Sequence, residues 1–142
     1  MTRTRLKLTS ANLETSAAGN RIASVQLELE QRVYLGTASV PLNGEEPELE
    51  AISGATLEAV KKALPVAINT QVKKVLKLRP EFLDDLLLVA IVELHVEHKK
   101  LSLTGCCVCH EKDKLPGMAR ATLDSTNRVV EFFLSKRRGI RQ

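Results

Sequence analysis

Cysteine and histidine are the residues of this chain with the clearest capacity for chemistry. Cys106, Cys107 and Cys109 stand almost together, and His95 and His98 precede them. Thiolates and imidazoles suggest zinc, but a structural zinc site needs four ligands that converge from turns. In a strand, Cys107 and Cys109 point to one face while Cys106 points to the other. We therefore expect small buried core cysteines, and neither a metal nor a cofactor. A metalloprotein or hydrolase built on this cluster is the alternative.

No other arrangement in the sequence predicts catalysis. The chain lacks a G-x-S-x-G elbow, a P-loop and an H-E-x-x-H helix. Asp84 and Asp85 form an acidic pair where a solvated loop is expected. Asp124 and Asn127 share a predicted helix with no matching ligand set elsewhere. We therefore predict no catalytic residues and a protein that is not an enzyme.

The positive charge of the chain is concentrated near its C-terminus. The net charge is +4, and the positive charges near the C-terminus match it: Lys136, Arg137, Arg138 and Arg141. Such a tail can contact phosphates without reading sequence. Single-strand binders also present aromatic stacking platforms, and aromatic residues make up only 3% of this chain. A solubilising or helix-capping tail is thus favoured, and nucleic-acid association through the tail is an alternative function.

Length and composition indicate one globular domain. The chain has 142 residues, of which 44% are hydrophobic and 27% charged. The basic N-terminus has no apolar stretch behind it, so no secretory signal is expected. The longest apolar run, residues 86–92, is too short to span a bilayer. Three clustered cysteines are not a disulfide framework, which favours a reducing, cytoplasmic location.

An internal duplication organises the chain. Ala-Thr-Leu-Glu at residues 55–58 recurs as Ala-Thr-Leu-Asp at 121–124. We expect a single domain over residues 1–142, with repeat one at 5–65, a linker at 66–72, repeat two at 73–135 and a basic tail at 136–142. The strand segments match in order: Leu6 and Leu8 with Leu76 and Leu78; Ala23, Val25, Leu27 and Leu29 with Ala90, Val92, Leu94 and Val96; and Tyr34, Gly36, Ala38 and Val40 with Leu103, Gly105, Cys107 and Cys109.

Each repeat predicts three strands and a helix. Alternating apolar residues indicate half-buried strands, and the last two strands of each repeat are close enough for a hairpin. Turns near 31–32 and 99–100 would set Val25 opposite Ala38 and Val92 opposite Cys107. Residues 43–48 predict a capped helix start, and Pro65 ends that helix at Leu64. The second helix should start around residues 113–116. The predicted fold is α+β, with tandem β-β-β-α units and antiparallel sheet carrying both helices on one face. Whether the repeats form one sheet or two is left open.

Residues 86–92 break the strand alternation because they are apolar on both faces. One explanation is a central strand whose second face is covered by the chain's own loops. The other is an oligomer interface, since a bare sheet face here would be an exposed apolar patch. We predict self-association through Leu87, Val89, Ile91 and Val108. Val33 and Leu35 could extend the same patch.

The architecture resembles a known regulatory domain. Two β-β-β-α units, with a last helix reading Ala-Thr-Leu-Asp-Ser-Thr-Asn-Arg-Val-Val over residues 121–130, are similar to the C-terminal regulatory domain of 2-isopropylmalate synthases. The resemblance implies a domain that dimerises and binds an amino-acid inhibitor near the dimer interface. The family's catalytic barrel is not part of these residues, and the stretch before the second helix is lysine-rich. We therefore expect a non-enzymatic regulatory or protein-interaction domain, homodimeric and open to a small effector.

Overall fold

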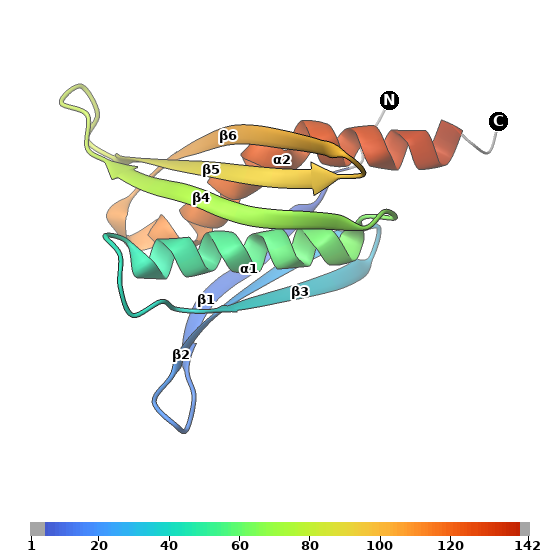
Figure 1. Ribbon diagram of the computed structural model, residues 1–142. Coiled ribbons are helices and arrows are strands. Elements are labelled where there is room, and N and C mark those ends of the chain that lie inside the picture. Colours follow the sequence, from blue (N-terminus) through green and yellow to red (C-terminus); the bar gives the residue numbers. More distant parts are fainter. Residues whose placement is uncertain (1–4, 140–142) are drawn as a thin grey trace.

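The computed structural model describes the backbone of residues 5–139 and the side chains of residues 5–135. Three strands and a helix follow one another twice along the chain (Figure 1), which confirms the predicted α+β fold of tandem β-β-β-α units. The elements are β1 (Lys7–Thr15), β2 (Arg21–Leu29), β3 (Arg32–Ser39), α1 (Pro47–Ala63), β4 (Ile68–Leu78), β5 (Leu86–Val96), β6 (Lys99–Cys109), the short 3-10 helix η1 (Glu111–Asp113) and α2 (Lys114–Gly139).

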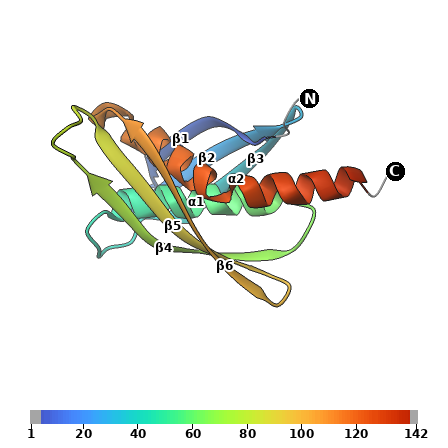
Figure 2. The ribbon, with the colours of Figure 1, turned by 90° about the horizontal axis from the view of Figure 1, so that it is seen from above.

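The strands form two separate antiparallel sheets, ordered β1-β2-β3 and β4-β5-β6. The two helices lie between the sheets, as the two views show together (Figure 1, Figure 2). Each helix packs on its own sheet, and each also contacts the first strand of the other unit, α1 with β4 and α2 with β1. One buried cluster contains residues from both units, so the repeats share a core.

A glycine at the same place in each sheet lets the helix approach the strand closely. Gly36 pairs with Val25 across the β2–β3 ladder, and Gly105 pairs with Ala90 across the β5–β6 ladder. A Cβ built on Gly36 would lie 1.9 Å from the Ala55 carbonyl oxygen of α1. The same contact recurs at Gly105, where that distance to a helix carbonyl is 2.3 Å. The duplication is therefore repeated in the packing as well as in the sequence.

The first strand of each unit carries a bulge at the same position. The ladder shifts between Leu8 and Ser10 in β1 and between Val72 and Lys74 in β4. This alignment makes Ala11 the counterpart of Val75. The match of Leu6 and Leu8 to Leu76 and Leu78 was therefore wrong. The match of Val25 to Val92 was wrong by two residues, because Val25 and Ala90 each pair with the close glycine of their sheet. Because β4 starts at Ile68, it occupies much of the segment 66–72 that the sequence assigned to the linker.

The hairpin registers also differ from the expected ones. Val25 lies opposite Gly36 rather than Ala38, and Val92 lies opposite Leu103 rather than Cys107. The first turn is the two-residue pair Glu30-Gln31, with φ of 49° and 72°. Tight turns of this kind usually carry Asn or Gly, and neither residue marks the position of this turn. Both slips are even-numbered, so the predicted inward residues still face inward.

The helices begin and end close to their predicted bounds. Helix α1 has no side-chain cap at Glu46, contrary to expectation, and starts with Pro47. It ends at Leu64, which is extended before Pro65, as predicted. The α2 backbone continues to Gly139, so the first part of the basic tail, residues 136–138, is helical.

Candidate functional site: the outer face of the second sheet

The predicted interface residues come together on the face of the second sheet that points away from the helices. In β5, buried residues such as Leu88 alternate with the partly exposed Leu87, Val89 and Ile91. Leu87 pairs with Val108 of β6, which is 52% exposed. None of these four side chains belongs to the shared core. They therefore form one surface, as a strand with two apolar faces requires.

Strand β4 adds two residues to this surface that the sequence did not identify. Leu76 pairs with Val89, and Leu78, 41% exposed, pairs with Leu87. The correct register would have placed both next to the predicted residues. We call this surface the outer apolar patch, made of Leu76, Leu78, Leu87, Val89, Ile91 and Val108.

Val33 and Leu35 do not extend the outer apolar patch. Both lie in β3, which belongs to the other sheet. The helices separate the two sheets, so the outer faces point in different directions (Figure 2). The sequence placed these residues on the patch because it left open whether the repeats formed one sheet or two.

The first sheet carries mostly polar residues at the positions that correspond to the outer apolar patch. The two bulges and the two close glycines align the sheets position by position. Val89 corresponds to Ser24, and Ile91 corresponds to Gln26. The counterparts of Leu76, Leu78, Leu87 and Val108 are Asn12, Glu14, Ile22 and Ser39. The fold thus accepts polar residues at five of these six positions, all except that of Ile22.

The other half of this outer face is charged. Glu93, only 5% exposed, is covered by longer side chains. His95 Nε2 lies 2.8 Å from Glu93 Oε1, and the ammonium groups of Lys100 and Lys73 lie 3.5 and 3.7 Å from Oε2. The His95 hydrogen bond lowers the pKa of the Glu93 carboxyl against the opposing effect of burial, and the two lysines lower it further. The face is therefore divided into an apolar half and a mainly cationic half.

The cysteine cluster does not form a metal site in the described part of the chain. No group of three or more His, Cys, Asp or Glu converges there. Cys107 and Cys109 pack against the core, and burial raises the pKa of both thiols. Cys106 is exposed on the outer face beside Val89, and its backbone N–H donates to Asp124 Oδ2 at 3.0 Å. Thiols with raised pKa values are poor nucleophiles, so Cys107 and Cys109 resemble structural residues.

Of the other candidate residues, Asp85 lies two residues before Leu87, at the border of the outer apolar patch, and the tail residues lie beyond the described side chains. The Asp85 carboxylate oxygen Oδ1 lies 2.7 Å from His110 Nδ1. Asp84 is exposed in the loop between β4 and β5. Lys136, Arg137 and Arg138 belong to the α2 backbone with undescribed side chains, and Arg141 lies outside the described residues. Nucleic-acid association through the tail therefore stays a prediction.

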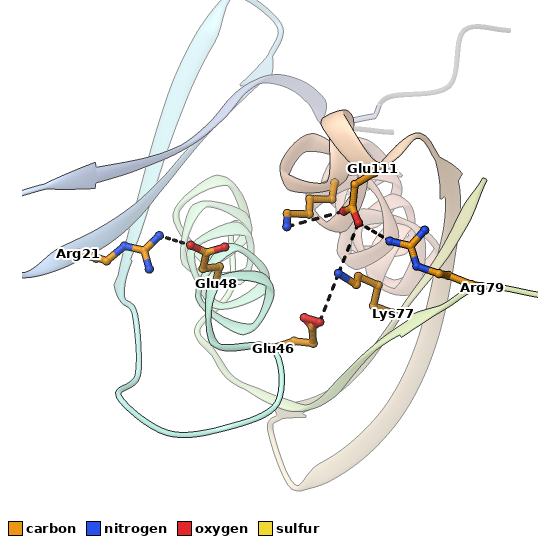
Figure 3. A network of polar contacts seen from close by, with 7 residues as sticks. Arg21, Glu46, Glu48, Lys77, Arg79 and Glu111 are labelled. Carbon is orange, nitrogen blue, oxygen red and sulfur yellow. Dashed lines mark hydrogen bonds and ion pairs between the residues drawn. The ribbon is translucent and has the colours of Figure 1, made fainter. Parts of the chain in front are cut away.

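Ion pairs at one end of the molecule join the two repeats (Figure 3). Lys77 of β4 lies 3.7 Å from Glu46, which precedes α1, and 3.7 Å from Glu111 of η1. Glu111 also pairs with Arg79 and with Lys114. Burial opposes ionisation of Glu111, but the surrounding cations hold its pKa below the ordinary value. This network connects Glu46 of the first repeat with Lys77 and Glu111 of the second repeat.

Comparison with known proteins found no matching family model and no similar curated protein. The resemblance to the regulatory domain of 2-isopropylmalate synthases therefore stays a prediction. Within the described residues, no helix is both long and apolar enough to cross a membrane.

Proposed function

We propose that this chain is a non-enzymatic interaction domain that forms a homodimer through the outer apolar patch. One observation carries the proposal: the patch is apolar where five of the six equivalent positions of the first sheet are polar. Since the fold tolerates serine and glutamine there, folding alone does not account for Val89 and Ile91. Contiguous apolar surface on a protein of this size is typical of an interaction site.

The division of the outer face supports pairing with a second copy. A homodimer interface is usually self-complementary about a two-fold axis. An axis that lies in the interface and runs across the strands at Val89 would place patch against patch. It would also carry the cationic halves, with Lys73 and Lys100, to opposite ends of the dimer. An axis along the strands would place cation over cation, which like-charge repulsion disfavours.

The predicted resemblance supports the same role. The regulatory domain of 2-isopropylmalate synthases implies a paired scaffold that responds to a small effector. The two β-β-β-α units and their shared core provide such a scaffold. We propose a regulatory task in which the dimer is the working unit.

Val89→Glu tests the dimer, with Ser24→Glu as its matched control. Both substitutions put a carboxylate on a partly exposed outer-face position of a central strand. The molecular mass in solution is measured by light scattering, with circular dichroism to verify folding. We expect a dimer for the unmodified protein and for Ser24→Glu, and a folded monomer for Val89→Glu. A monomeric unmodified protein, or a dimeric Val89→Glu variant, overturns the proposal.

Cys106 provides an independent test of the geometry. It lies in the same row as Leu76 and Val89, so an axis along that row places Cys106 of the two copies across from each other. Sheets that pack face to face lie about 10 Å apart, within reach of a short bismaleimide. We expect rapid cross-linking of the unmodified dimer and none after Cys106→Ser. Failure to cross-link a proven dimer would place the axis elsewhere.

A further inference from the structure

A groove lies between the β5–β6 hairpin and the C-terminal half of α2. Its volume is about 420 Å³, within the range typical of small-molecule sites. The floor is apolar, made by Val96, Leu101, Val129 and the two phenylalanines of α2, Phe132 and Phe133. The two rings meet edge to face, with centroids 5.5 Å apart, so the wall they form has a defined shape.

This groove exists because the second helix is longer than the first. Helix α1 ends at Ala63, whereas α2 has 26 residues and continues along the hairpin. The shared Ala-Thr-Leu motif makes Val66 and Ala67 the counterparts of Phe132 and Phe133. Both follow the end of α1, so the first repeat has no such wall. One side of this extension belongs to the shared core, through Val130 and Leu134, whereas Phe132 on another side is 59% exposed.

The rim of the groove is charged and mainly positive. Arg128 of α2 and Lys99 of β6 stand on it, together with Glu97 of the hairpin turn. All three are exposed, and the ion pairs found among the described residues involve neither cation. An arginine fork at the mouth of an apolar groove suits a carboxylate attached to an apolar body.

We propose that this groove binds a small amphipathic carboxylate, with the apolar body between β6 and α2 and the carboxylate at Arg128 and Lys99. The site is separate from the outer apolar patch. Leu87 and Val108 lie at one end of their strands, whereas Val96 and Lys99 border the turn at the other end. Binding therefore does not depend on dimerisation, although one scaffold carries both features.

Nuclear magnetic resonance titration of the full chain with octanoate tests the site, and 1-octanol serves as the uncharged probe. We expect saturable shifts of the Val96, Leu101 and Val129 amides with octanoate, and weaker binding of octanol. Arg128→Gln should weaken octanoate binding by about fivefold, the effect of losing an exposed charge pair. Lys62→Gln is the matched control, because Lys62 is the counterpart of Arg128 on α1 and donates to the Leu35 carbonyl.

The outcomes separate this site from the dimer. Repeating the titration on the Val89→Glu variant tells whether the groove works in a monomer, and we expect unchanged affinity. Non-saturable shifts, shifts confined to the outer apolar patch, or equal affinity for octanoate and octanol would each overturn the proposal. So would a Lys62→Gln variant that loses as much affinity as Arg128→Gln.

Discussion

Alanine at Gly36 should destabilise the protein, because the strand and helix α1 leave no room for a methyl group. The new Cβ would lie 1.9 Å from the Ala55 oxygen and 2.5 Å from the Ala59 nitrogen. Both are backbone atoms, so no side-chain rotation relieves the overlap. Reaching an ordinary contact of 3.4 Å requires the helix to retreat by about 1.5 Å. That movement opens gaps along the rest of the interface.

The expected loss is large for a single methyl group. Overpacking of a tight core typically costs 1–3 kcal/mol of folding free energy. Because rigid backbone lies on both sides of Gly36, we expect Gly36→Ala to cost about 3 kcal/mol. Gly105→Ala should behave alike, since its Cβ meets the Ala121 oxygen and the Ser125 nitrogen, each at 2.3 Å. For a chain of this length, 3 kcal/mol lowers the melting temperature by about 10 °C.

Gly54→Ala is the matched control and should have the opposite sign. Gly54 lies inside α1, where an added Cβ meets only the Ala38 Cβ at 3.5 Å, an ordinary contact. Alanine in a helix interior stabilises by about 0.5–1 kcal/mol relative to glycine. Urea unfolding followed by circular dichroism measures all three variants. The reasoning fails if Gly36→Ala lies within about 0.5 kcal/mol of the unmodified protein, or if Gly54→Ala is equally harmful.

Two further predictions concern titration and thiol reactivity. Because the folded state holds the pKa of Glu111 below its unfolded value of 4.5, its stabilising effect is present above that pH and is lost as the pH falls below it. Glu111→Gln should thus unfold at a lower urea concentration at pH 7, with the difference vanishing near pH 3; a constant difference would contradict the ion-pair account. Thiol reactivity is measured at pH 8 on the Val89→Glu variant, in which the proposed dimer is dissociated. Cys106 should react faster than Cys107 and Cys109, because burial raises the pKa values of the latter two thiols. Mass spectrometry of the peptides decides this, and equal rates would contradict it.

The local patterns of the chain determined much of its architecture. Alternating residues placed the inner faces of β2 and β5, and Pro65 ended α1 at Leu64. The continuous apolar run 86–92 predicted a strand with two apolar faces and correctly grouped Leu87, Val89 and Ile91. These features follow from period and backbone sterics, which act over a few residues. For that reason they are readable without the fold.

Pairing between distant segments was decided by the tertiary structure. The turn at Glu30-Gln31 has positive φ without glycine or asparagine, so the hairpin register could not be read from the residues. The same holds for the bulge that brings Leu76 beside Val89, and for the separation of the sheets, which removed Val33 and Leu35 from the patch.

The groove lined by Arg128 could be found only from the tertiary structure. Its walls are β6 and the extension of α2, which sequence patterns described separately but could not place together. A pattern of 2.0 or 3.6 residues tells which side of an element is buried, not which neighbour covers it. The duplicated units and their apolar faces therefore follow from local sequence patterns. The packing of one unit on the other decided which faces remained open.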